Sequence, residues 1–131
     1  LLNILLPDSQ PNKKIYDSFE KLISSINLEN WIFFYIFFEI NLIKELGYDA
    51  NLTEHLNKLK DEDLIKIKID GYIYEIPNYL IHKKIPNDFN NNLIRKSLYF
   101  TRQMMQNKFF IPNNLIFPKS RIILENYFNK N

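Results

Sequence analysis

The sequence contains no cysteine and only two glycines among its 131 residues. Without cysteine the chain cannot form a disulfide, a cysteine-ligated zinc or iron–sulfur centre, or a thiol nucleophile. Two isolated glycines leave no room for a glycine-rich phosphate-binding loop. The longest apolar run, Trp31–Ile43, is interrupted by Glu39 and Asn41, whereas a membrane span needs about 20 apolar residues. We therefore expect a buried central helix there and no membrane span.

The remaining composition is that of an ordinary globular domain. Hydrophobic residues make up 46% of the chain and charged residues 24%, which excludes global disorder. The length suits one domain with a single core. Because the chain begins with Leu1 rather than Met, we interpret residues 1–131 as a fragment: a single domain that lacks a preceding part. Leu1–Leu6 is too short for a signal peptide.

Two helices are predicted in the N-terminal half. The first follows Pro11-Asn12, and the central one runs from about Asn30 to Leu46, with Gly47 at the position of a left-handed C-cap. A short helix is predicted over Thr53–Leu59. The apolar face of the first helix is defined by its spacing at Ile15, Phe19, Leu22, Ile23 and Ile26.

Two more helices are predicted in the C-terminal half. A long one begins at a cap formed by Asn87 or Asp88 and runs to about Asn107. Arg95 and Arg102 lie along the edge of its apolar arc. That arc consists of Ile94, Leu98, Thr101 and Met105, with Leu93, Ser97, Phe100 and Met104 beside them. The last helix follows Pro118 and carries Ile122, Ile123, Tyr127 and Phe128.

Residues 64–76 change from helical periodicity to strict alternation. Asp70-Gly71 supplies the two residues that a tight hairpin turn requires. The resulting register pairs Lys66 with Glu75, which is a favourable cross-strand pair. The same register places Ile69 opposite Tyr72, Ile67 opposite Tyr74 and Ile65 opposite Ile76. Since an isolated hairpin is marginal in water, its Ile/Tyr face must pack on the helices. The predicted fold is mainly α, a compact helical bundle with one small β-hairpin.

The sequence contains no recognisable catalytic set. His55 and His82 have no metal-ligand spacing, and Asp61-Glu62-Asp63 lacks the rest of a calcium loop. Glu39, alone in an apolar helix, is expected to be a buried hydrogen-bonding partner rather than a catalytic acid. An enzymatic function would require a cleft that gathers Glu39 with one of the histidines. We expect no enzyme, no metal and no cofactor.

Charge is distributed unevenly along the chain. Residues 83–131 carry a net charge of +7 and residues 1–82 carry −5. This asymmetry suggests an acidic partner for the C-terminal third, although an ordinary solvated helix surface is the alternative. Charges spread over two helices and a loop would not hold DNA strongly unaided, since strong nonspecific binders make about 6–10 phosphate contacts. A short acidic peptide ending in an apolar residue fits an apolar groove flanked by arginines better.

Several short stretches resemble one protein family. Phe38–Tyr48, with the sequence FEINLIKELGY, is similar to the signature Phe-Glu-x-x-Leu-Leu-x-x-Leu-Gly-Tyr of RecO, the bacterial recombination mediator and DNA-repair protein. Leu5-Leu6-Pro7 through Tyr16 resembles the opening of the helical domain in that family. Phe100-Thr101-Arg102 and Pro118-Lys119-Ser120-Arg121 resemble two C-terminal stretches. The likeness covers roughly residues 5–128.

The resemblance implies a non-enzymatic role for the chain as the C-terminal helical domain of RecO. Members of the family bind and anneal DNA, partner RecR, and dock the acidic, Phe-ending tail of single-stranded-DNA-binding protein, which helps to load RecA. An N-terminal OB-fold, a main DNA-binding element, would lie upstream, so this domain alone should bind DNA weakly. The resemblance also implies a cytoplasmic, nucleoid-associated protein.

The chain departs from the family pattern at two places within this domain. Many members carry a four-cysteine zinc site around the hairpin. The positions of its first cysteine pair correspond to His55 and Lys58 in this chain, so zinc is not expected. Members often have arginine just before the Phe-Glu pair, where this chain has Ile36 and Phe37. We therefore do not expect this chain to make an anion contact there.

The sequence thus leads to a hypothesis of a binding domain. Its candidate partner-binding or anion-binding residues are Arg95, Arg102, Lys119, Arg121, Leu98 and Met105. The basic residues would pair with an acidic tail and secondarily with nucleic acid. The apolar ones would bury its anchor, although residues of this kind are more often plain core than groove wall. The alternative is a structural helical module that braces the missing N-terminal domain and has no ligand site of its own.

Overall fold

The computed structural model describes residues 13–25, 30–47 and 52–129. These residues form helices and one hairpin in the following order: α2 (Lys13–Ser25), α3 (Trp31–Glu45), the 3₁₀ turn η1 (Leu52–His55), β1 (Leu64–Ile69), β2 (Tyr72–Pro77), α4 (Asn78–His82), α5 (Asn91–Met105), the π-helical turn η2 (Gln106–Phe110) and α6 (Lys119–Tyr127). The mainly α fold with one small hairpin is confirmed.

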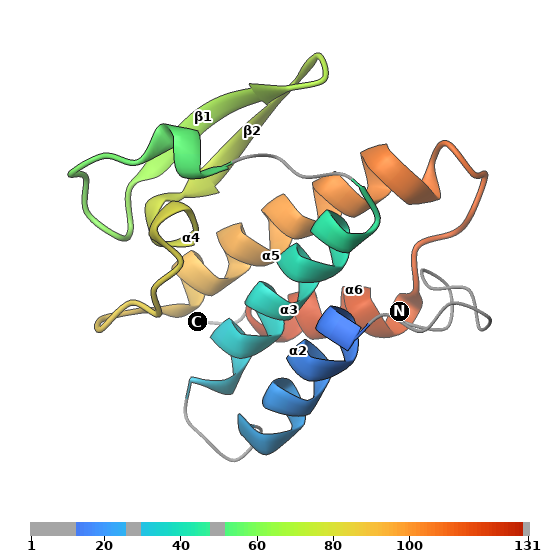
Figure 1. The fold of residues 1–131 in the computed structure, drawn as a ribbon, viewed down its shortest axis with the longest axis horizontal. Coiled ribbons are helices and arrows are strands. Elements are labelled where there is room, and N and C mark those ends of the chain that lie inside the picture. The colour runs from blue at the N-terminus through green and yellow to red at the C-terminus, as the bar shows by residue number, and fades with distance from the viewer. Residues whose placement is uncertain (1–12, 26–29, 48–51, 130–131) are drawn as a thin grey trace.

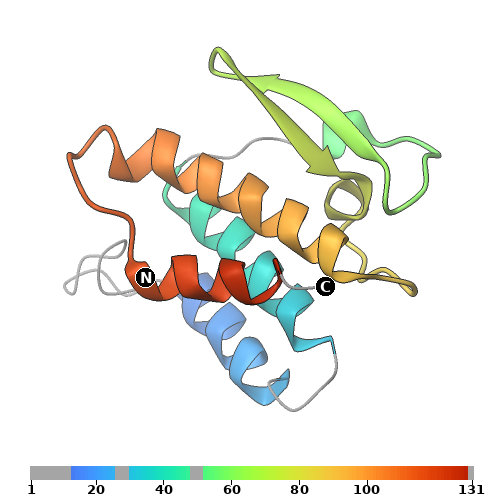
Figure 2. The ribbon, with the colours of Figure 1, turned by 180° about the vertical axis from the view of Figure 1, so that it is seen from behind.

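The elements are stacked in a simple order. The hairpin packs on α5, α5 on α3, and α3 on α2 (Figure 1). Helix α6 crosses the back of this stack, in contact with α5, and comes to the front when the molecule is turned around (Figure 2). Helix α3 therefore lies in the middle of the bundle.

Helix α3 is apolar on nearly all sides because helices cover it on more than one side. Its buried residues are Ile32, Phe33, Ile36, Phe38, Glu39, Leu42 and Ile43. Gly47 adopts φ +90° and its N–H donates to the carbonyl of Lys44 at 2.9 Å, which confirms the predicted helix end. Among the described residues, no helix is both long enough and apolar enough to cross a membrane.

The predicted first helix corresponds to α2. Leu22 is partly buried against the core, whereas Ile23 is exposed, so the buried face of α2 is narrower than the spacing predicted. Ile26 and the side chains of Ile15 and Phe19 lie outside the described residues, as do the first residues of the 5–16 segment.

Helix α5 confirms the predicted apolar arc: all eight of its residues are buried. The predicted cap at Asn87 or Asp88 is wrong. Asn90 caps the helix, since its side chain accepts a hydrogen bond from the Leu93 N–H at 2.9 Å. Before the cap, Phe89 packs edge-on against Phe33, with ring centroids 4.8 Å apart.

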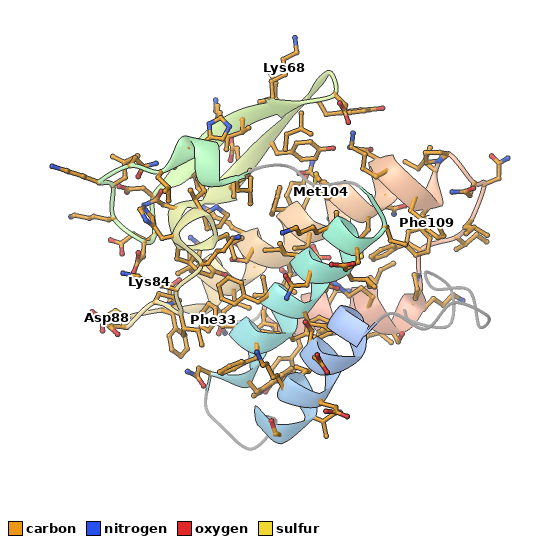
Figure 3. All side chains as sticks on the ribbon, in the orientation of Figure 1. Phe33, Lys68, Lys84, Asp88, Met104 and Phe109 are labelled. Carbon is orange, nitrogen blue, oxygen red and sulfur yellow. The ribbon has the colours of Figure 1, made fainter. Side chains whose placement is uncertain are left out.

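The hairpin has the predicted register at every pair, including Lys66 opposite Glu75. Asp70 and Gly71 adopt φ +50° and +90°, as a two-residue turn of the primed type requires. Tyr74 packs edge-on against Phe100 of α5 and accepts a hydrogen bond from Asn107 at 3.0 Å. The hairpin face is therefore anchored on α5 as expected, and Met104 of α5 is buried on this side (Figure 3).

The predicted helix over Thr53–Leu59 is wrong in length, since only η1 forms. The side chain of Asn57 donates to the carbonyl of His55 and accepts from the N–H of Leu59. Such local side-chain bonds compete with helix formation. The chain turns there and enters β1.

The apolar residues of α6 do not mark its buried face. Ile122, Ile123 and Tyr127 are exposed, and only Phe128 of the four predicted residues is buried. The side of α6 that faces the bundle instead carries Arg121 and Glu125. A simple apolar pattern could not predict this orientation.

The turn glycine offers a test of the hairpin. We expect Gly71→Ala to lower the free energy of unfolding by about 1–2 kcal/mol, because a non-glycine residue in the left-handed region is strained. A Cβ at Gly71 meets no atom within 4 Å, so the cost is purely conformational. Urea unfolding measures it, and Gly71→Asn, which tolerates this conformation, is the control. Equal stability of the alanine variant and the wild type would contradict the turn geometry.

Candidate binding surface

The structure does not bring the predicted binding residues to one surface. Leu98 and Met105 are fully buried in the core, and Arg121 is buried on the side of α6 that faces the bundle. Arg95 and Lys119 are exposed, and the side chain of Arg102 is 31% exposed. Only the last three can reach a partner in this conformation.

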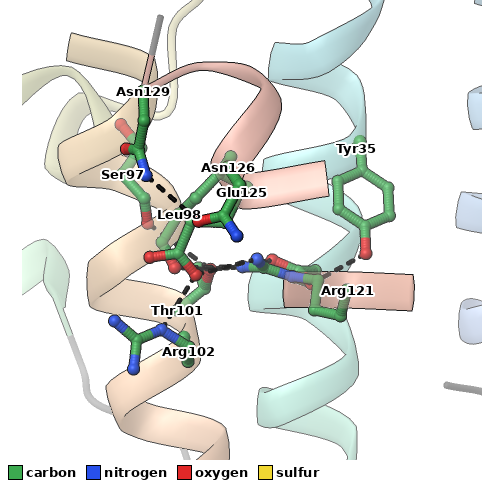
Figure 4. Close-up of polar contacts among 10 residues, drawn as sticks. Tyr35, Ser97, Leu98, Thr101, Arg102, Arg121, Glu125, Asn126 and Asn129 are labelled. Atoms are coloured by element: carbon green, nitrogen blue, oxygen red, sulfur yellow. Dashed lines mark hydrogen bonds and ion pairs between the residues drawn. The ribbon is translucent and has the colours of Figure 1, made fainter. Parts of the chain in front are cut away.

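The buried Arg121 forms a two-pronged ion pair with Glu39. Its Nε donates to Oε2 of Glu39 at 2.6 Å and its Nη2 donates to Oε1 at 3.0 Å. Figure 4 shows Arg121 between Tyr35 on α3 and Thr101 on α5. Because buried charges are costly unless they are paired and hydrogen-bonded, this pair fixes where α6 lies.

Every other polar group around the pair also has a partner. Glu39 accepts further hydrogen bonds from the hydroxyls of Thr101 at 2.7 Å and Tyr35 at 2.9 Å. Nη2 of Arg121 also donates to the carbonyl of Leu98 at 3.0 Å. The expectation that Glu39 is a buried hydrogen-bonding partner is confirmed.

The network shifts the pKa of Tyr35 and the pKa of Arg121. Burial, together with the charge of Glu39, raises the pKa of the Tyr35 hydroxyl. Burial alone would lower the pKa of Arg121, but the adjacent Glu39 carboxylate outweighs it and raises the pKa. Arg121 thus stays charged and Tyr35 stays neutral at any physiological pH.

Glu125 extends this network to the surface. Its Oε2 accepts from Nε of Arg102 at 2.8 Å and from Nη1 of Arg121 at 3.4 Å. Glu125 is the one acidic residue between positions 89 and 129, and it is buried. The exposed charges that residues 89–129 themselves contribute are therefore positive.

An arginine–tyrosine–arginine stripe occupies the outer face of α5. Arg95, Tyr99 and Arg102 are spaced i, i+4 and i+7, which places them on one side of the helix. We call these three residues the α5 stripe. The guanidinium of Arg102 lies over the Tyr99 ring, 4.9 Å from its centroid, and Tyr99 remains 47% exposed. Sequence analysis missed Tyr99, although its spacing between the two arginines was visible.

The described residues contain no group of three or more His, Asp or Glu side chains that could hold a metal ion. Among the predicted residues, Arg95 and Lys119 expose a guanidinium and an ammonium group, and Arg102 is partly exposed; such groups are suited to anions.

The comparison with protein families identifies the chain. The sequence model of the family described as "Recombination protein O C terminal" matches residues 1–108. The chain belongs to the RecO C-terminal domain family. No curated protein and no solved structure matches the chain. Membership places this RecO domain in DNA repair and recombination.

The structure gives a physical reason for the motifs that resemble RecO. Three of those stretches supply the buried network: Glu39 from the first, Thr101 and Arg102 from the second, and Arg121 from the third. A lone acid in an apolar helix predicts a buried basic partner. The sequence offers many lysines and arginines, so the partner could not be chosen without the fold.

Removing one half of the buried ion pair should be costly. We expect Arg121→Met to lower the free energy of unfolding by about 3–5 kcal/mol, because Glu39 is left buried without its counter-charge. The double variant Glu39→Leu with Arg121→Met should regain most of this loss, since no unpaired charge remains. Urea unfolding of both variants measures the difference. A double variant that is less stable than Arg121→Met would argue against the ion-pair account.

The raised pKa of Tyr35 predicts alkaline destabilisation. In the unfolded chain this hydroxyl ionises near its ordinary pKa of 10.0, while in the folded chain it keeps its proton. Above pH 10 the folded domain therefore binds more protons than the unfolded chain. The contribution of Tyr35 to the free energy of unfolding is retained below pH 10 and falls as the pH rises above it. Burial also raises the pKa of Tyr79. Thermal unfolding from pH 8 to pH 11 should show a shallower fall for Tyr35→Phe than for the wild type, and an identical slope would disprove this role.

Proposed function

We propose that this RecO domain is a non-catalytic binding module that docks the acidic tail of single-stranded-DNA-binding protein on the exposed basic surface of α5 and α6. Membership of the recombination-protein family is the observation that carries the proposal. The single sign of exposed charge between residues 89 and 129 supports it, because complementary charge guides and orients such partners.

The predicted residues divide into two roles. Arg95, Arg102 and Lys119 would contact the carboxylates of the tail. Leu98, Met105 and Arg121 are buried, and they would act by holding α5 and α6 in place. The apolar end of the tail would then rest on exposed side chains, of which Tyr99 and Ile122 are candidates.

The wider role follows the family. The complete protein would partner RecR, assist DNA binding and annealing, and help to load the recombinase, in the cytoplasm near the nucleoid. DNA affinity of the present domain alone would be weak, because few phosphate contacts are available on its basic surface.

A second candidate function is a structural module that braces another domain. The exposed face of α6 and the residues before it favour this alternative, since Ile116, Ile123 and Tyr127 are 87%, 68% and 69% exposed. Exposed apolar clusters mark contact sites in many proteins. Under this alternative, the basic residues would be ordinary surface.

Peptide binding separates the two candidates. We expect a labelled acidic, Phe-ending peptide to bind the chain in fluorescence anisotropy at low salt, with an affinity that falls as salt is added. Arg95→Glu should weaken binding about tenfold, as expected for reversal of one accessible charge in the contact. Arg95 makes one hydrogen bond, to the neighbouring Asn92, so this variant should fold normally.

The matched control is Lys68→Glu, which makes the same charge change on the outer side of the hairpin (Figure 3). Arg102→Glu is less suitable, because it would place a second acid beside the buried Glu125. Equal affinities of Arg95→Glu and wild type, or no binding at all, would rule out tail docking at the α5 stripe and favour the bracing module.

A further inference from the structure

We propose that Tyr99 is a stacking platform for an unpaired base, which makes the α5 stripe selective for single-stranded over double-stranded DNA. The inference rests on the proposed role in DNA transactions and adds a specific residue, a contact and a preference to it. Neither charge count nor family membership assigns this role to Tyr99.

The first step of the argument is the position of the ring. Tyr99 is 47% exposed on α5, whereas Phe100, the other aromatic residue of this helix, is buried. An exposed ring between two arginines offers a flat apolar surface within a positive field, which is the combination that single-strand binding proteins use.

The second step is that the ring is held in place. Arg102 covers one part of the ring, with its guanidinium 4.9 Å from the centroid. Arg102 is itself fixed by Glu125, and Glu125 by the buried Arg121. Because the platform is connected to the rigid interior, a stacked base would lose little binding energy to ordering the side chain.

The third step is the supply of phosphate contacts. Arg95 lies one helical turn before Tyr99, about 6 Å along the axis, and is exposed. Its guanidinium can reach a phosphate next to a base that stacks on Tyr99. Residues 89–129 contribute no exposed acid, and the acid that precedes them, Asp88, lies before the start of α5.

The preference for a single strand follows from access. In a duplex the bases are stacked on each other and paired, so their faces cannot reach a ring on a convex helix surface without unstacking. A duplex can therefore use Arg95 and Arg102 only, whereas a single strand uses the arginines and the ring.

Equilibrium binding with two DNA probes tests the inference. A labelled mixed-sequence oligonucleotide is titrated with the full chain, alone and after annealing to its complement, at low salt. We expect Tyr99→Leu to bind the single strand about 5- to 100-fold more weakly and the duplex as the wild type does. Tyr99→Phe should bind as the wild type, because the ring is retained.

The control is Tyr127→Leu, which removes another exposed tyrosine, from α6. It should leave both affinities unchanged. Arg95→Gln should weaken both probes and reduce the salt dependence by about one phosphate contact, whereas Tyr99→Leu should leave the salt dependence as it is.

Two results would overturn the inference. One is a Tyr99→Leu variant that loses affinity equally for both probes, or for neither. The other is a wild-type chain that binds the acidic peptide but neither DNA probe, which would leave tail docking intact. Circular dichroism of each variant confirms that the fold is retained, so a loss of affinity is not a loss of structure.

Discussion

The ion pair between Glu39 and Arg121 is the interaction on which the arrangement of this domain depends. It joins α3, in the middle of the bundle, to α6, at the end of the described chain. Both side chains are almost completely buried, so the pair is stable only while α3, α5 and α6 keep water out. The position of α6 and the burial of the ion pair therefore depend on each other, because α6 covers the pair and the pair holds α6 in place.

The same network links the core to the surface. Glu125 binds Arg121 on its inner side and Arg102 on its outer side, and Arg102 in turn lies on Tyr99. Four alternating charges thus run from the centre of the bundle to the α5 stripe, and their formal charges cancel. The positive surface that we propose as a binding site consists mainly of basic side chains outside this ion-pair network, above all Arg95 and Lys119. A rigid core of this kind suits a domain that presents a fixed surface to a partner.

Local patterns predicted the parts of the fold that local physics decides. The Asp70-Gly71 turn and the alternation around it determined the hairpin register at every pair, and helical spacing identified the buried arc of α5.

Prediction failed where a long-range contact decided the outcome. At the start of α5 the sequence offers Asn87, Asp88 and Asn90 as caps, and the structure uses Asn90, next to Phe89, which packs on the distant Phe33. The orientation of α6 depends on the contact between Arg121 and Glu39. The apolar residues Ile122, Ile123 and Tyr127 suggested a different buried face, but all three are exposed. Arg121 was expected to bind a partner because it is basic, but its partner is internal. Tyr99 lies outside the predicted arc of α5, and its spacing between Arg95 and Arg102 would have placed it with them on the exposed side of the helix.

Hydrogen exchange in the native state tests most directly whether the buried pair holds the domain together. If it does, α6 opens only when the core unfolds, so the amides of residues 119–127 should be as well protected as those of α3 and α5. Exchange followed by mass spectrometry at several denaturant concentrations should then show α3, α5 and α6 merging into a single cooperative unit. Exchange of α6 many times faster than that of α3, in the absence of denaturant, would show that the helix detaches independently and that the ion pair does not govern the fold.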